Sequence, residues 1–247
     1  MTDYFRQVES ESARLAELAT GVDPATPVPP CPGWTLADLI THVGSLHRWA
    51  AHVVGTRRQE PIWPRQVPNG LAEGQRGDPA WLLAGAGELA AALRATAPDT
   101  PVWAWGDDQR AGWWARRMVF ELVVHRCDAE LAVGVAPAVA APVAIDGIEE
   151  LLDCLPHVSW VTKRLAELGA EGATIHLHAG DADGEWTLTQ GPEGGITWAR
   201  GHAKGDAAVQ APVSDLLLML YGRRSPDALT VHGDRALLER WLAAASL

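Results

Sequence analysis

VFELVVHRCDAE, residues 119–130, places a glutamate and a histidine four positions apart in an otherwise apolar segment. Side chains four residues apart lie on the same face of an α-helix, so Glu121 and His125 are neighbours. Apolar residues on all sides of the pair indicate a buried helix. Burying an unpaired charge is costly. Glu121 must therefore be neutral, hydrogen-bonded, paired with a positive charge or bound to a metal ion.

The sequence before this segment predicts that the helix belongs to a bundle. Apolar periodicity predicts helices over residues 3–20, from Thr35 onward, and over 79–97 and 111–133. Thr35 followed by Asp38 is a capping-box pattern, with Asp in the place of the usual Glu. Four helices joined by loops are typical of a four-helix bundle.

The periodicity changes in the second half of the chain. A helix over 143–168, interrupted near Pro156, leads into segments in which polar and apolar residues alternate. The expected strands lie in ATIHLHAG (173–180), GEWTLTQG (184–191), GITWARGH (195–202), AAVQAP (207–212) and ALTVHG (228–233), with helices over 213–224 and 234–245. The expected fold class is α + (α+β): a helical bundle in residues 1–145 and a small α+β domain in residues 146–247.

Composition limits the function. The 247 residues carry a net charge of -11, which argues against a nucleic-acid partner. No run approaches the ~18 apolar residues of a membrane span, and the first 20 residues lack the apolar core of a signal peptide. The three cysteines form no paired framework, which favours a reducing cytoplasm. We expect a cytoplasmic protein with no nucleic-acid or membrane partner.

His42 is the candidate that turns the pair into a metal site. It falls on or beside the apolar seam of the helix that begins at Thr35, whereas His47 and His52 are expected further round that helix. Ligands from facing helices converge inside bundles, and two histidines with one glutamate are a known Zn²⁺ set. The alternative is a Glu121–His125 hydrogen bond beside a core histidine, and the residues alone leave both open.

Other titratable residues carry weaker hypotheses. Asp128 lies on the same face as Glu121, where it either orients His125 or, as the sequence favours, faces solvent. Cys127 points to another side of the helix and is a poor nucleophile candidate, as are Cys31 and Cys154. Arg223 and Arg224 lie at a helix end. There they complement the helix dipole, which the local sequence favours, or hold a carboxylate.

Three blocks together resemble the mycothiol-dependent maleylpyruvate isomerase family. They are PPCPGWTLADLITHVGSLHRWA (29–50), FELVVHRCDAELAVG (120–134) and VSDLLLMLYGRRSPDALTVHGDRALLERW (213–241). The resemblance implies a DinB-like four-helix bundle followed by a sterol-carrier-like α+β domain. It also implies Zn²⁺, or another divalent metal, bound by His42, Glu121 and His125, and a functional arginine that maps best onto Arg223.

The resemblance further implies mycothiol as a thiol cosubstrate. A metal-bound thiol is delivered as a thiolate, which adds to the cis double bond of a small-molecule carboxylate and leaves after rotation. The same site suits S-transfer to another electrophile. Mycothiol is an actinobacterial thiol, which agrees with a composition in which 18 of the 20 basic residues are arginine. The alternatives are a non-catalytic, metal-stabilised binding or regulatory protein and a metal-dependent hydrolase on the same bundle.

Overall fold

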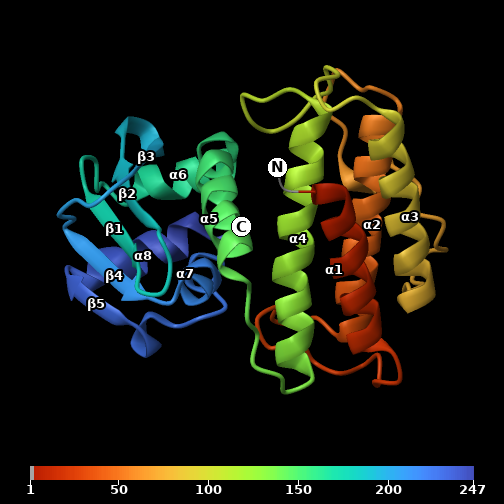
Figure 1. The fold of residues 1–247 in the computed structure, drawn as a ribbon, viewed down its shortest axis with the longest axis horizontal. Helices are drawn as coiled ribbons and strands as arrows, with labels where there is room; N and C mark the ends of the chain where they lie inside the picture. Colours follow the sequence, from red (N-terminus) through yellow and green to blue (C-terminus); the bar gives the residue numbers. More distant parts are fainter. Residues whose placement is uncertain (1–2) are drawn as a thin grey trace. The chain divides into compact units, whose positions relative to one another are not determined.

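The computed structural model describes residues 3–247, which form two compact units, residues 3–137 and Ala138–Leu247 (Figure 1). The division expected at residue 145 falls within the first helix of the second unit, Ala141–Cys154. Across residues 3–247, no helix combines the length and the apolar character that crossing a bilayer requires. The helical first unit and the mixed second unit confirm the predicted α + (α+β) class.

The N-terminal unit is a four-helix bundle (Figure 1). Its helices are α1 (Tyr4–Ala19), α2 (Leu36–Gly55), α3 (Pro79–Ala95) and α4 (Ala111–Ala132), with one 3-10 turn at Pro64–Gln66. Each of α1 and α2 packs against both α3 and α4. The apolar residues that surround Glu121 on α4 are buried, so the prediction of a buried helix is confirmed.

The start of α2 is fixed by local hydrogen bonds. The Thr35 hydroxyl accepts from the Asp38 backbone N–H at 3.3 Å, and the Asp38 carboxylate accepts from the Thr35 backbone N–H at 3.0 Å. The hydroxyl also donates to that carboxylate at 2.7 Å. These bonds to Thr35, with a contribution from Arg76, lower the pKa of Asp38 to about 2. The predicted capping box is confirmed.

Helices α2 and α3 approach closely where Gly44 meets Trp81. A Cβ added at Gly44 would overlap the Trp81 ring. The Arg48 guanidinium lies 4.1 Å from the centre of that ring and donates to the carbonyl oxygens of Gly44 and Trp81, both at 3.0 Å. The glycine is therefore required for the distance between the helices.

His47 corrects one expectation about α2. The sequence placed it away from the apolar seam, but its exposed fraction is only 1 %. The reason is that α2 is covered on two sides, by α3 and by α4, so its buried surface is wider than one stripe. Burial lowers the pKa of His47 to about 4, and the ring is neutral at pH 7.

The C-terminal unit contains one five-stranded sheet in the order β3-β2-β1-β4-β5. Its strands are β1 (Thr174–Ala179), β2 (Glu185–Gln190), β3 (Ile196–Arg200), β4 (Ala207–Ala211) and β5 (Thr230–Gly233). Its helices are α5 (Ala141–Cys154), α6 (Ser159–Glu167), α7 (Val213–Leu220) and α8 (Arg235–Ala245), with 3-10 turns at Leu155–His157, Pro192–Gly194 and Pro226–Ala228. Strands β1 and β4 are parallel, and the other neighbours are antiparallel.

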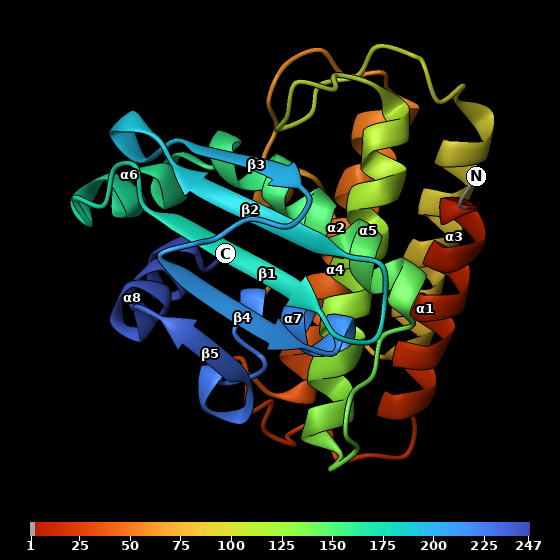
Figure 2. The ribbon, with the colours of Figure 1, turned by 60° about the vertical axis from the view of Figure 1, so that its left-hand side comes forward.

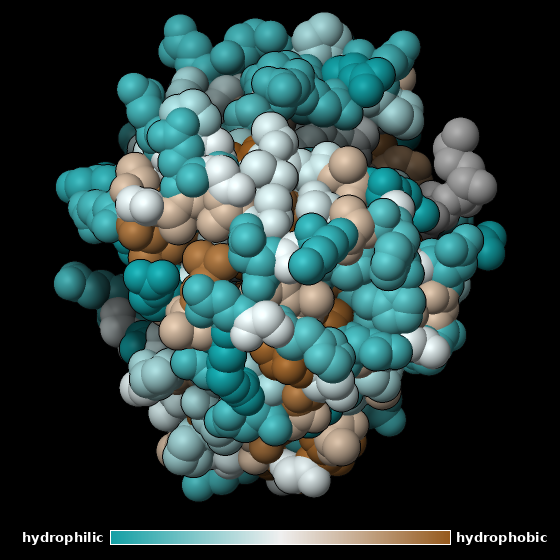
Figure 3. Space-filling view, turned by 90° about the vertical axis from the view of Figure 1, so that its left-hand side faces the viewer, coloured by the Kyte–Doolittle hydropathy of each residue, from teal (hydrophilic) through white to brown (hydrophobic). Residues whose placement is uncertain are grey.

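The helices of this unit lie on one face of the sheet (Figure 2). The side chains of Ile175, Leu177 and Val209 are buried and form the core beneath that face. Successive strand residues point to opposite faces, so His176 and His178 belong to the other face. Figure 3 views the protein from the side of the sheet and shows a surface on which hydrophilic and apolar residues are interspersed.

Helix α7 ends earlier than the sequence suggested. It was expected to run to residue 224, but it stops at Leu220 because Gly222 adopts a left-handed φ of 75°. The Arg223 N–H then donates to the Leu218 carbonyl at 2.7 Å, and the Gly222 N–H to the Met219 carbonyl at 2.9 Å. This is a Schellman motif, and it fixes the backbone of Arg223.

Candidate metal centre

Two helices of the bundle bring three side chains to one point. His42 comes from α2, and Glu121 and His125 come from α4. One ligand atom from each lies within 4.8 Å of the other two. The rings of His42 and His125 meet edge to face, with their centroids 4.9 Å apart. The structure therefore brings together the trio named from the sequence, and their role as metal ligands stays a prediction.

The Glu121 carboxylate has two partners on its own helix. The Arg117 guanidinium donates to Oε1, and Nε2 of His125 lies 3.4 Å from Oε2. Burial by itself would raise the pKa of Glu121, but the charges of Arg117 and His125 outweigh burial and hold the pKa well below its usual range. Glu121 is an anion at every physiological pH. Sequence reasoning missed Arg117, although its position four residues before Glu121 was a usable signal.

Asp128 is buried, so its predicted exposure to solvent was wrong. Its side chain is 0 % exposed, and its Oδ2 lies 2.9 Å from Nδ1 of His125. Burial tends to lower the pKa of His125, but the hydrogen bonds to Asp128 and Glu121 raise it above the usual value. A proton on Nδ1 is the arrangement that donates to Asp128, and it directs Nε2 toward Glu121. Asp128 therefore orients the imidazole.

His42 is held in its neutral form. Burial, with a further contribution from the charge on His125, lowers the pKa of His42 to about 4. The Trp34 ring covers both histidines, with centroids 4.9 Å from His42 and 6.4 Å from His125. A neutral imidazole is the form that binds a metal ion. Trp34 was not expected from the sequence to lie at the site.

The donor set suits a divalent transition metal. Four-coordinate Zn²⁺ with bonds of about 2.0–2.2 Å holds its ligand atoms about 3.3 Å apart, so side chains already within 4.8 Å need only small shifts. Binding would replace the proton on Nε2 of His125. A second group, Cys31 with His125 and Asp128, also has its ligand atoms within 4.8 Å. The two groups share His125 but use opposite nitrogens of its ring.

The remaining cysteines have no reactive setting. Cys127 is fully buried, and burial raises the pKa of its thiol to about 12. Cys154 is also buried and donates from Sγ to the Glu150 carboxylate at 3.1 Å. Because the thiolate is the nucleophile, neither side chain is suited to attack a substrate at neutral pH.

The two candidate arginines lie in the C-terminal unit, just after α7. Nη1 of Arg223 donates to the Tyr221 carbonyl at 2.5 Å. Arg224 forms an ion pair with Asp215, with Nη2 and Oδ1 2.8 Å apart. Arg224 thus neutralises a carboxylate on α7, whereas the backbone of Arg223 is fixed by the Schellman motif. The role of Arg223 in binding a substrate carboxylate stays a prediction.

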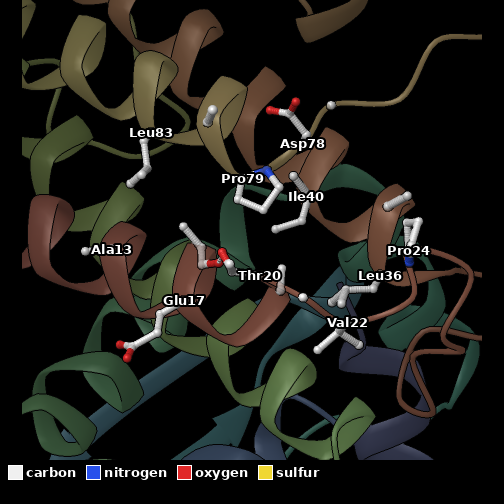
Figure 4. A pocket seen from close by; sticks show the side chains of 16 residues that line it. Ala13, Glu17, Thr20, Val22, Pro24, Leu36, Ile40, Asp78, Pro79 and Leu83 are labelled. Atoms are coloured by element: carbon white, nitrogen blue, oxygen red, sulfur yellow. Dashed lines mark hydrogen bonds between the residues drawn. The ribbon is translucent and has the colours of Figure 1, made fainter.

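A pocket of about 830 Å³ in the bundle lies apart from this trio. It is lined by α1, α2, α3 and the loops beside them, and includes Thr20, Leu36, Ile40, Pro79 and Leu83 (Figure 4). Its walls are mostly apolar, and none of the three candidate ligands lines it. The pocket therefore supplies no chemistry to the candidate metal centre.

Comparison with protein families gives two matches that together cover most of the chain. Residues 5–130 match the model of the mycothiol maleylpyruvate isomerase N-terminal domain. Residues 142–240 match the model of the C-terminal domain of the same proteins. No curated protein sequence matches the chain significantly.

Comparison with solved structures supports the fold. The structure of the mycothiol-dependent maleylpyruvate isomerase aligns with a TM-score of 0.59 and 17% identity, over 93% of this chain and 91% of that one. A histidine-to-alanine mutant of that isomerase gives the same TM-score of 0.59, identity of 17% and coverages of 93% and 91%. The likeness extends over both units and concerns the fold alone.

Proposed function

Because the chain belongs to the mycothiol-dependent maleylpyruvate isomerase family, we propose that it is a metal-dependent enzyme that activates mycothiol for addition to a small electrophile. The observation that carries the proposal is the convergence of His42, Glu121 and His125 from two helices. An anionic carboxylate beside two imidazoles in a partly buried position is stable next to a cation. Membership of the family supports the use of mycothiol, and the convergence of the three side chains supports a metal site that would activate the thiol.

Each residue of the site has a separate task in this proposal. His42 and His125 bind through ring nitrogens, and Glu121 supplies negative charge to the cation. Asp128 holds Nδ1 of His125 and leaves Nε2 for the ion. Arg117 positions the Glu121 carboxylate. When bound, Zn²⁺ or another divalent ion lowers the pKa of a coordinated thiol and makes the thiolate available at neutral pH.

The proposed reaction is the cis–trans isomerisation of maleylpyruvate or a related thiol transfer. In the isomerisation, the mycothiol sulfur bonds to one carbon of the cis double bond, and the π electrons move onto the adjoining carbonyl group. The carbon–carbon bond is then single and rotates, after which the carbon–sulfur bond breaks and the trans double bond forms. Arg223 is the proposed anchor for a substrate carboxylate, to which its planar guanidinium is suited.

The first test measures the metal and the thiol at the site. Untagged protein substituted with Co²⁺ is titrated with mycothiol while its visible spectrum is recorded. We expect a spectral shift in the wild type, and we expect His125→Ala to lose one equivalent of metal together with the shift. His52→Ala, on the same helix as His42, is the matched control and should keep both. A His125→Ala protein with the full metal content would refute the ligand set.

Activity assays then separate the alternatives. Isomerisation or thiol transfer that requires mycothiol supports the proposal, whereas turnover without any thiol indicates the hydrolase. Metal binding without a thiol-induced shift and without turnover indicates the binding or regulatory protein. Arg223→Ala should keep the metal content and raise the KM for a carboxylate substrate. If Arg224→Ala alone has that effect, Arg224 is the anchor instead.

A further inference from the structure

A second cluster of metal-ligand residues lies on the helix-free face of the C-terminal sheet. His176 and His178 are two residues apart on β1 and so share a face. Glu185 on β2 is paired directly with His178, and His202 follows the end of β3. One ligand atom from each of these four side chains lies within 4.8 Å of the others.

Glu185 is the centre of this histidine cluster, defined as His176, His178, Glu185 and His202. Nδ1 of His178 lies 2.5 Å from its Oε1, and Nδ1 of His202 lies 3.2 Å from its Oε2. Side chains at directly paired positions of antiparallel strands lie close together because the strand register sets their distance. The register between β1 and β2 therefore holds half of the cluster together.

His176 adds the observation that points to a ligand. It is 4 % exposed, and its Nδ1 lies 3.2 Å from the Thr187 hydroxyl. Its Nε2 is buried and has no hydrogen-bond partner among residues 3–247. A buried polar atom without a partner is costly and calls for an explanation. His176 also lines a pocket of about 230 Å³ together with His178 and His202.

We propose that these four residues bind a Zn²⁺ ion in a site of the structural type. Three imidazole nitrogens and one carboxylate oxygen complete a tetrahedral shell and leave no position for a substrate. The ion would give Nε2 of His176 the partner that it lacks. An arrangement of ion pairs alone accounts for His178, Glu185 and His202, but it leaves that nitrogen unpaired.

The proposed ion would link three parts of the sheet that strand pairing and the contacts of Glu185 with His178 and His202 already join. Its ligands come from β1, from β2 and from the segment between β3 and β4. Because the four ligands converge only in the folded chain, the ion would bind the folded state in preference to the unfolded state and stabilise it. The site is independent of the one at His42, Glu121 and His125, and its test does not rely on the proposed function.

The test uses the untagged, full-length chain carrying His125→Ala, in which the bundle site is disabled. Zn²⁺ is titrated in competition with a chromophoric chelator. We expect one Zn²⁺ per chain, and we expect Zn²⁺ to raise the Tm. Adding His202→Gln should weaken the affinity at least about tenfold, because loss of a supporting partner alone costs about 10–100-fold. His202 has a side chain that is 81% exposed, so this substitution does not endanger folding.

Two further variants complete the design. His176→Gln should abolish binding to the histidine cluster, and His157→Gln, at an exposed histidine of the same unit, should leave the affinity unchanged. The proposal is overturned if the His125→Ala chain takes up no Zn²⁺. It is also overturned if His202→Gln and His157→Gln bind with equal affinity, since uptake would then be nonspecific.

Discussion

At Asp128 a carboxylate with no exposed surface accepts from one nitrogen of His125, while the other nitrogen of that ring faces Glu121. Metal-bound histidines depend on such partners for orientation and basicity. On the proposed function, Asp128 orients His125 as a ligand and does not itself bind the ion.

We predict that Asp128→Asn weakens metal binding at the bundle site by about 10–100-fold. The amide keeps the shape of the side chain and an oxygen that accepts from Nδ1, but it lacks the negative charge. The measurement is competition for Zn²⁺ against a chelator, in protein that carries His202→Gln to weaken the proposed second site. An unchanged affinity would show that Asp128 does not act on His125.

A second variant, Cys31→Ala, distinguishes the two possible ligand groups at His125. The Cys31 thiol donates to Asp128 at 3.5 Å and could instead be a ligand together with His125. If His42, Glu121 and His125 bind the ion, Cys31→Ala leaves the affinity close to that of the wild type. Loss of the metal in Cys31→Ala would assign the site to Cys31, His125 and Asp128.

The sequence predicted some contacts of the site and not others. The spacing of Glu121 and His125 within one helix predicted their contact, because that distance is set by helix geometry alone. Asp128 was misjudged because its burial depends on neighbours that its own helix does not specify. The same limit applies to the histidine cluster, since alternation along β1 predicted a strand but not which residues of β2 and of the segment after β3 would lie beside it.

Among the elements, α2 and α3 show how one missing Cβ sets a helix–helix distance. Gly44→Ala should lower the free energy of unfolding by about 1–3 kcal/mol, the usual cost of overpacking, because the new methyl overlaps the Trp81 ring. Gly87→Ala is the matched control. Gly87 is exposed on α3 with nothing within 4 Å of an added Cβ, so that variant should be stabilised by up to about 1 kcal/mol. Urea denaturation measures both, and equal effects would contradict this account.

The sequence predicted the boundaries of helices well where adjacent residues alone set them. The capping box at Thr35 and the break near Pro156 depend on a few adjacent residues, and both were confirmed. The end of α7 was missed because Gly222 was read as part of the helix, although a glycine at that point favours a left-handed cap. The parallel pairing of β1 with β4 joins segments that are far apart in sequence, so no local pattern predicted it.

At the scale of the whole molecule, buried histidines make stability depend on pH. Folding lowers the pKa of His47 from 6.5 to about 4. Between these two pH values the unfolded chain therefore binds more protons than the folded chain. The contribution of His47 to the free energy of unfolding is fully present above about pH 6.5 and is lost as the pH falls toward 4. For His47 the full loss approaches about 3 kcal/mol as an order of magnitude.

We predict that His47→Leu reduces this acid sensitivity. Free energies of unfolding are measured in urea at pH 7.5 and pH 5.0 for both proteins, with the metal removed. The decrease between the two pH values should be smaller in the variant than in the wild type, by about 1–2 kcal/mol. Because each protein is compared with itself at the two pH values, the effect of leucine on packing cancels. Equal decreases in the two proteins would show that His47 does not titrate in the folded state as described.

The distribution of the bundle's ligands along the chain has a consequence for biosynthesis. His42 leaves the ribosome early, whereas Glu121 and His125 follow only when nearly all of the first unit has been translated. A nascent chain that ends before α4 holds one ligand of the trio and none of its charge-balancing partners. On the proposed function, the bundle can therefore take up its ion only after α4 has been translated, and truncating the chain within α4 removes the site.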